Sequence, residues 1–143
     1  MIQFKLSSEQ KLIQESTKEF AQQYISPGVI DRDQKSTFPK SQIRKLGELG
    51  YMGMMIPSKW GGSELDTISY VIAIEEIAAV ELATSTIMSV NNSLVCQVLN
   101  DFGTDEQKGK YLKSLASGKK LGAYCLSESQ SGSDASNINT IAK

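Results

Sequence analysis

The segment Tyr124–Asp134, YCLSESQSGSD, contains the residues whose types and spacing are best suited to ligand chemistry. Gly122–Leu126 has no helical period and predicts a buried strand, and Ser127 then begins a loop of small hydroxyl residues. Such a loop can offer successive backbone N–H groups and serine hydroxyls to a phosphate or to the edge of a flavin. Gly132 would let the backbone approach a ligand closely. A simple polar turn after a strand is the alternative, because hydroxyl-rich turns are common.

Glu75 and Glu76 form a candidate acid–base pair within a mostly apolar stretch. Adjacent helical residues point about 100° apart, so the two carboxylates cannot converge on one substrate atom. A glutamate buried in such a helix needs a partner, and Arg32, Arg44 or a lysine are all open as that partner. We therefore interpret both glutamates as structural.

The composition excludes several other kinds of site. The 143 residues include no His, which rules out His-based triads, His metal ligands and a His proton shuttle. Cys96 and Cys125 lie outside any C-x-x-C pattern, so no metal site is expected, and both are interpreted as free buried thiols in a reducing compartment. A net charge of −1 with only two arginines predicts no binding of nucleic acid or of an anionic membrane.

The N-terminal ten residues lack the apolar run of a signal peptide, and the apolar stretch Tyr70–Val80 is too short to span a bilayer. We therefore expect a soluble, intracellular protein without a membrane segment. The apolar periodicity and the capping residues Ser7, Asp66 and Thr104 predict a series of helices. The first ends at Pro27-Gly28, the second runs from Pro39 to Gly50, and the third follows Asp66 through about Ala79. The fourth has an apolar face from Ile87 to Val98 and ends near Gly103, and the fifth follows Thr104 and stops at Gly118. The third is apolar nearly all round and is expected to be buried.

The helical pattern ends at Leu121, where the expected strand and the Ser-, Gly- and Asn-rich tail begin. We predict an all-α N-terminal domain over residues 1–117, followed by the first strand and loop of a β domain over residues 118–143. The chain reads as truncated, as if it stopped within that second domain.

Short motifs follow one another along the helical part: Phe38-Pro39; Leu46-Gly47-Glu48-Leu49-Gly50; Ile56-Pro57 with Gly61-Gly62; Glu75-Glu76-Ile77-Ala78; and Gly103-Thr104-Asp105-Glu106-Gln107-Lys108 with Tyr111-Leu112. Together with Tyr124–Asp134, which resembles a strand followed by (T/S)-E-P-x-A-G-S-D, their order and spacing resemble the acyl-CoA dehydrogenase family. The run Met88–Leu94, MSVNNSL, is similar to the short-chain, butyryl-type branch. The resemblance covers essentially the whole chain.

The resemblance implies an FAD-dependent enzyme that oxidises a short-chain acyl-CoA to the trans-2-enoyl-CoA. In the family a carboxylate takes the α-proton, FAD accepts the β-hydride, and the electrons pass to an electron-transfer flavoprotein. That carboxylate belongs to a Glu near the far end of a longer chain, so no catalytic residue is expected in this one. The resemblance further implies a homotetramer when full length, in the bacterial cytoplasm or the mitochondrial matrix.

The resemblance also implies roles for particular residues. The expected FAD contacts are Tyr124, Cys125, Leu126, Ser127, Gly132 and Ser133. Ser133 would also lie near the phosphate-bearing part of the CoA substrate, and Ile87 and Val90 would close the floor of the acyl pocket. Ser129 stands where the family has Pro and Ser131 where it has Ala, and we expect both changes to loosen the loop.

Two alternatives remain open. The first is an acyl-CoA oxidase, or another flavoprotein of the same superfamily that reoxidises with O2. The second is a non-enzymatic helical module with a vestigial flavin loop, which only the serines at 129 and 131 support. A flavin absorbance spectrum would distinguish a flavoenzyme from a non-enzymatic module. The stability of the reduced flavin in air would distinguish a dehydrogenase from an oxidase.

Overall fold

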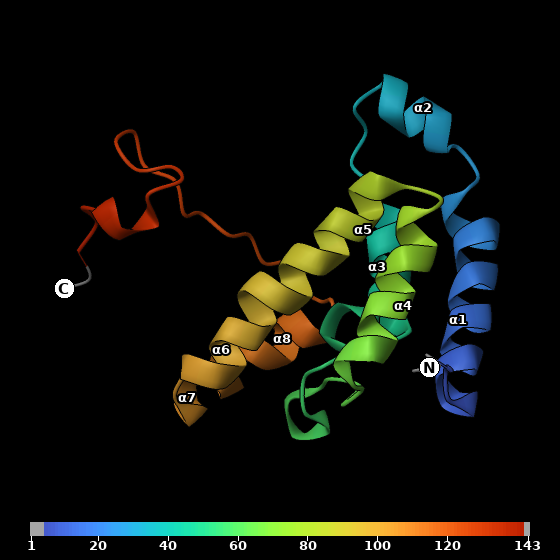
Figure 1. The fold of residues 1–143 in the computed structure, drawn as a ribbon, viewed down its shortest axis with the longest axis horizontal. Helices are drawn as coiled ribbons and strands as arrows, with labels where there is room; N and C mark the ends of the chain where they lie inside the picture. Colours follow the sequence, from blue (N-terminus) through green and yellow to red (C-terminus); the bar gives the residue numbers. More distant parts are fainter. Residues whose placement is uncertain (1–4, 142–143) are drawn as a thin grey trace.

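The computed structural model describes residues 5–141, and those up to Gly118 form a helical body from which the rest of the chain extends outward (Figure 1). The α-helices of the body are α1 (Ser8–Phe20), α2 (Val29–Gln34), α3 (Lys40–Glu48), α4 (Thr67–Ala78), α5 (Leu82–Ser89), α6 (Gln97–Phe102), α7 (Asp105–Gln107) and α8 (Lys113–Ala116). Turns of π-helix cover Ala21–Ile25, Val90–Cys96 and Lys108–Leu112, and short 3-10 turns cover Tyr51–Gly53, Ser58–Trp60 and Ala135–Asn137. The prediction of an all-α domain is confirmed.

Each helix start that a capping residue predicts is present. The Ser7 hydroxyl accepts from the Gln10 N–H while the Gln10 side chain accepts from the Ser7 N–H, and Thr104 and Gln107 repeat this arrangement before α7. The Asp66 carboxylate accepts from the backbone N–H three residues later and caps α4. These side chains satisfy N–H groups that have no partner within their helices.

The predicted helix ends are also confirmed. Gly50 follows α3 with φ +82° and Gly118 follows α8 with φ +68°, both in the left-handed region that disfavours a side chain. Pro39 directly precedes α3, one residue before the position that the sequence favours. Helix boundaries vary by this much with the criterion used.

The long central helix runs through α5, the π-type turn Val90–Cys96 and α6 without a break, because the linking residues keep right-handed helical angles. Figure 1 shows it crossing the body from the α3–α4 side to α7 and α8. The main core lies where α1, α3 and α4 meet its first half, and its fully buried members include Leu46, Met52 and Ile77. A smaller hydrophobic core lies at the second half of the central helix and includes the buried residues Cys96 and Leu112.

α4 is less buried than its sequence predicts. Tyr70, Ala73 and Ile77 are buried against the core, but the side chains of Ile68 and Val71 are 58% and 53% exposed. The expectation of burial all round was therefore wrong for one stripe. The reason is that the described neighbours, chiefly α1 and α5, cover only the opposite side of the helix.

Residues 119–141 extend away from the body, and the buried strand expected at 122–126 is not formed (Figure 1). These residues are extended, and Leu121, Tyr124 and Leu126 are exposed. A strand is stable only beside partner strands, and the described part of the chain contains only one isolated bridge, between Glu128 and Ser131. Within residues 5–141, no helix is both long and apolar enough to cross a membrane.

Candidate functional site

The candidate flavin segment, Tyr124–Ser133, leaves the helical body at Gly122. The Gly122 N–H donates to the Asn91 side-chain oxygen at 2.9 Å. A Cβ at position 122 would lie 2.6 Å from a methyl carbon of Val95, closer than carbon atoms approach, so only glycine fits against the central helix here. The start of the segment is therefore fixed on the body by one hydrogen bond and one close contact.

The backbone of residues 123–127 is open. Tyr124, Cys125, Leu126 and Ser127 are all exposed, and no acceptor for the N–H groups of residues 123–127 lies within the described part of the chain. The expectation that Cys125 is buried was wrong, whereas Cys96 is buried and its desolvation raises the pKa of that thiol to about 12. A row of open N–H groups can bind a neighbouring strand or a ligand edge.

The loop that follows is closed on itself by Glu128. Its carboxylate accepts from the backbone N–H of Asn139 at 2.9 Å and of Thr140 at 3.0 Å, and also from the Thr140 hydroxyl. These bonds, led by the one from the Thr140 hydroxyl, lower the pKa of the exposed Glu128 carboxyl from 4.5 to about 2. The ionised carboxylate thus holds residues 128–140 in one turn.

The hydroxyl residues of this turn differ in what they contact. The Ser131 side chain is buried and donates to the Asp134 carbonyl oxygen at 2.7 Å, which is a bond within the turn that an alanine could not make. The expected loosening at positions 129 and 131 stays a prediction. Among the described residues, the Ser129 hydroxyl donates only to the side chain of its neighbour Gln130, at 3.0 Å. Ser133 is exposed, and nothing lies within 4 Å of where a Cβ on Gly132 would stand. The structure therefore leaves Gly132 and Ser133 accessible to a ligand.

Ile87 and Val90 lie on the central helix, apart from the candidate flavin segment, and both are half-buried. Ile87 lines a cavity of about 610 Å³ beneath α2, which Phe38 and Leu82 also line, while Val90 does not line it. The two side chains are thus neighbours on one helix but do not share a described cavity. Their role as the floor of an acyl pocket stays a prediction.

Arg32 and Glu81, which line this cavity, form a largely buried ion pair that the sequence did not reveal. The Arg32 Nε–Glu81 Oε1 distance is 2.8 Å, and the guanidinium also donates to the Ile25 and Pro27 carbonyl oxygens. Arg32 is therefore not the partner of Glu75 or Glu76, which the sequence had left open. Of those two, Glu75 is exposed and Glu76 accepts from the Gln14 amide at 2.9 Å, as suits structural residues.

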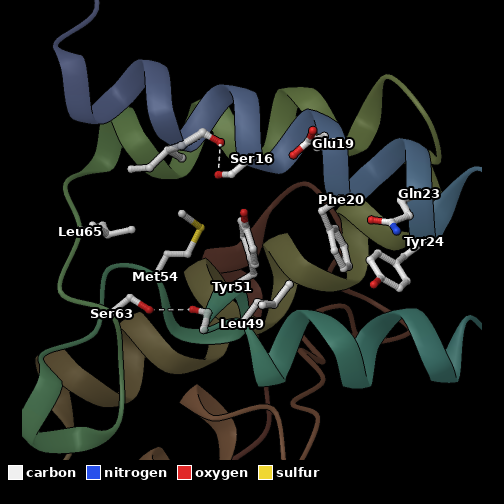
Figure 2. A pocket seen from close by; sticks show the side chains of 12 residues that line it. Ser16, Glu19, Phe20, Gln23, Tyr24, Leu49, Tyr51, Met54, Ser63 and Leu65 are labelled. Carbon is white, nitrogen blue, oxygen red and sulfur yellow. Dashed lines mark hydrogen bonds between the residues drawn. The ribbon is translucent and has the colours of Figure 1, made fainter.

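Another cavity, of about 430 Å³, lies between α1 and the segment that follows α3 (Figure 2). Phe20, Tyr51 and Met54 line it, and the two serines at its edge already bond to backbone oxygens. No buried side-chain polar atom in the described residues lacks a partner. None of the residues that the sequence predicts for a site lines this cavity, and we assign it no ligand.

The fold and the segment define a helical domain that leads into an exposed, hydroxyl-rich extension. Residues 7–119 match the family "Acyl-CoA dehydrogenase, N-terminal domain". The short-chain specific acyl-CoA dehydrogenase of Clostridium acetobutylicum is 39% identical over 97% of this chain and 37% of its own length. This chain belongs to the acyl-CoA dehydrogenase family, and it spans a little over a third of the length of that relative.

Two solved structures agree with this assignment. Butyryl-CoA dehydrogenase from Megasphaera elsdenii superposes with a TM-score of 0.88 at 34% identity, over 97% of this chain and 37% of that one. A structure described as the electron transferring flavoprotein of Acidaminococcus fermentans, in work on flavin-based electron bifurcation, contains a chain that superposes with a TM-score of 0.90 at 38% identity. That match covers 95% of this chain and 36% of the other.

Proposed function

We propose that this chain is the N-terminal part of a flavoprotein that oxidises short-chain acyl-CoA to trans-2-enoyl-CoA and passes the electrons from FAD to an electron-transfer flavoprotein. The observation that carries the proposal is the open segment Tyr124–Ser133, fixed at its start and exposed along its length, on a domain of the acyl-CoA dehydrogenase family. Residues 1–117 would form the helical domain and 118–143 the start of the β domain.

The segment is suited to FAD in three respects. The N–H groups near Leu126 and Ser127 lack acceptors in the described chain, and the Ser127 hydroxyl is exposed beside them, so together they can meet the polar edge of the isoalloxazine. The open space at Gly132 permits close approach of a ligand, and Ser133 can donate to a phosphate of FAD or of the CoA substrate. When bound, FAD supplies the redox chemistry, and these residues bind and orient it.

The helical body would line the part of the site that holds the acyl chain of the substrate. Ile87 and Val90 project from one stretch of the central helix, three residues apart, and branched side chains there would shorten an acyl pocket. We further propose a homotetramer when full length, located in the bacterial cytoplasm or the mitochondrial matrix. The similarity to the Acidaminococcus structure supports the electron-transfer flavoprotein as partner.

A hybrid protein tests this proposal directly. The 143 residues would replace the matching region of the Clostridium acetobutylicum enzyme, whose remaining residues supply the rest of a family member. We expect the purified hybrid to be yellow and to reduce a dye with butyryl-CoA, and we expect the isolated 143-residue chain to show no turnover and weak FAD binding. A folded hybrid without flavin, or turnover by the isolated chain, would contradict the proposal.

The same hybrid separates dehydrogenase from oxidase. After reduction by butyryl-CoA under anaerobic conditions, the flavin is exposed to air and its absorbance is followed. A reduced flavin that persists in air and is reoxidised by an electron-transfer flavoprotein supports the proposal. Rapid reoxidation by O2 with formation of peroxide would favour the oxidase instead.

A further inference from the structure

Two adjacent asparagines, Asn91 and Asn92, are buried in the middle of the central helix, where their side chains are 0% and 1% exposed. Buried amides are stable only when their donors and acceptors are all paired. Each of these side chains makes three hydrogen bonds to backbone groups, two as donor and one as acceptor. The two residues are therefore alike in burial and in the number of backbone bonds, and Asn91 Nδ2 in addition donates to the Cys96 Sγ at 3.6 Å.

Asn92 bonds only within the helical body. Its Nδ2 donates to the Tyr51 carbonyl oxygen at 2.8 Å and to the Met88 carbonyl oxygen at 2.9 Å. Its Oδ1 accepts from the Met54 N–H at 2.8 Å. Asn92 thus fastens the segment after α3 to the central helix.

Asn91 joins three separate parts of the chain. Its Nδ2 donates to the Met52 carbonyl oxygen at 2.8 Å and to the Leu115 carbonyl oxygen at 3.2 Å, and its Oδ1 accepts from the Gly122 N–H at 2.9 Å. The same amide therefore holds the segment after α3, the end of α8 and the start of the extension. Only this asparagine reaches beyond the helical body.

The bond to Gly122 is the last hydrogen bond between body and extension in the described residues. Beyond it, the N–H groups of residues 123–127 have no acceptor there, and the turn from Glu128 bonds only within itself. The candidate flavin segment begins at Tyr124, two residues after this point. The place where it leaves the helical body is therefore held by the Asn91–Gly122 bond, next to the close contact of Gly122 with Val95 and the bond from the Lys120 N–H to the Ser114 carbonyl oxygen.

We propose that Asn91 is a positioning residue for flavin binding, which fixes the point and direction at which Tyr124–Ser133 leaves the helical domain. The inference rests on the proposed function, because it takes that segment to contact FAD. Asn91 acts through Gly122 and does not itself touch the cofactor. Preorganised contacts of this kind lower the entropy lost when a ligand binds.

The first test uses the 143-residue chain and the matched pair Asn91→Ala and Asn92→Ala. Both changes remove one buried amide and leave three backbone groups without it, so we expect similar shifts of the unfolding midpoint. The Gly122 amide should exchange its hydrogen faster in Asn91→Ala by roughly tenfold or more relative to Asn92→Ala. Equal exchange at Gly122 in the two variants would overturn the proposal.

The second test measures the dissociation constant of FAD in the hybrid enzyme. We expect Asn91→Ala to bind FAD about threefold to tenfold more weakly than Asn92→Ala, the effect of about one hydrogen bond. Gly122→Ala, whose Cβ would collide with Val95, should weaken FAD binding in the same way while Asn91 remains intact. If one asparagine variant does not fold, Gly122→Ala decides the question, and an unchanged dissociation constant for FAD in that variant would overturn the positioning role.

The outcomes separate this inference from the proposed function. A yellow hybrid in which both asparagine variants lose FAD equally, in proportion to their lost stability, would overturn the positioning role and leave the proposed function standing. A wild-type hybrid that folds without FAD would overturn the proposed function and this inference with it. Selective loss of FAD in Asn91→Ala and Gly122→Ala supports the positioning role.

Discussion

The helical body and the extension from residue 119 are stabilised in different ways. In the body, side chains such as Leu46, Met52 and Ile77 are fully buried, and caps or asparagines satisfy the backbone between helices. In the extension the large apolar side chains are exposed, and a surface carboxylate, Glu128, holds the one closed turn. The body thus contains its own core, whereas the extension presents backbone and side chains that further contacts can use.

This contrast shows which parts of the structure are defined by local sequence signals. A helix satisfies its hydrogen bonds within one segment and needs only a core on one face. A strand is stable only beside a second strand, and the apolar run at 122–126 has none among the described residues, so its side chains are exposed.

The largest expected contrast is in stability. Replacing the fully buried Leu46 by Ala should lower the free energy of unfolding by about 2–5 kcal/mol, because it removes core contacts and leaves a cavity. Leu126→Ala, at a side chain 40% exposed, should change it by less than about 0.5 kcal/mol. Urea unfolding of the 143-residue chain measures both. Comparable losses would show that the extension is packed in solution.

A smaller effect is expected on cofactor binding. In the hybrid enzyme, Ser133→Ala should weaken FAD retention or raise the KM for butyryl-CoA by about tenfold to a hundredfold, because a hydrogen bond to a charged group contributes about 1.5–3 kcal/mol. The unfolding midpoint should not change. Ser129→Ala is the control, since the hydroxyl of that exposed side chain donates to Gln130 next to it. Identical flavin content and kinetics in both variants would mean that Ser133 serves only the turn.

The helical body should determine chain-length preference. In the hybrid, Ile87→Ala combined with Val90→Ala should raise kcat/KM for six- and eight-carbon acyl-CoA relative to butyryl-CoA, since each CH2 accommodated contributes about 0.8 kcal/mol. Ile74→Ala, at another half-buried side chain that packs against the main core, is the control. An unchanged chain-length profile with a much lower melting temperature would assign Ile87 and Val90 to the core alone.

The smallest effect concerns the closed turn of the extension and its dependence on pH. The pKa of Glu128 is lowered from 4.5 to about 2 by the Thr140 hydroxyl and the neighbouring N–H groups. The stabilisation that the Glu128 carboxylate gives the turn is therefore fully present above about pH 4.5 and is lost as the pH falls through about 2. Carbon-13 NMR of the Glu128 carboxyl should show this titration, and Asn139 and Thr140 amide shifts should follow it. Titration near pH 4.5 would mean that the turn is open in solution.

Much of the body could be predicted from the sequence because its signals are local. Ser7, Asp66 and Thr104 mark helix starts, and Gly50 and Gly118 mark helix ends, each through a contact or dihedral angle within a few residues. The burial of α4 was overestimated because hydrophobicity alone does not show which neighbours a helix has. The candidate segment was found from its hydroxyl-rich composition and from its resemblance to the family.

The contacts between distant segments could not be predicted in this way. The pairing of Arg32 with Glu81 joins residues 49 positions apart, and the bonds of Asn91 reach up to 39 positions along the chain. Neither shows a periodic or motif-like signal. Nor did the sequence show that the Ser131 hydroxyl bonds to the Asp134 carbonyl oxygen.

The paired asparagines also have a consequence for the order in which the chain folds. The central helix can begin from local contacts, but the Asn92 amide gains its Tyr51 and Met54 partners only when a segment 38 to 41 residues earlier has docked. Bonds that close such long loops form late, after much of the ordering entropy has been lost. Such bonds affect the rate of unfolding more than the rate of folding. We therefore expect the bonds of the two asparagine side chains to form late in folding and to slow the unfolding of the helical body.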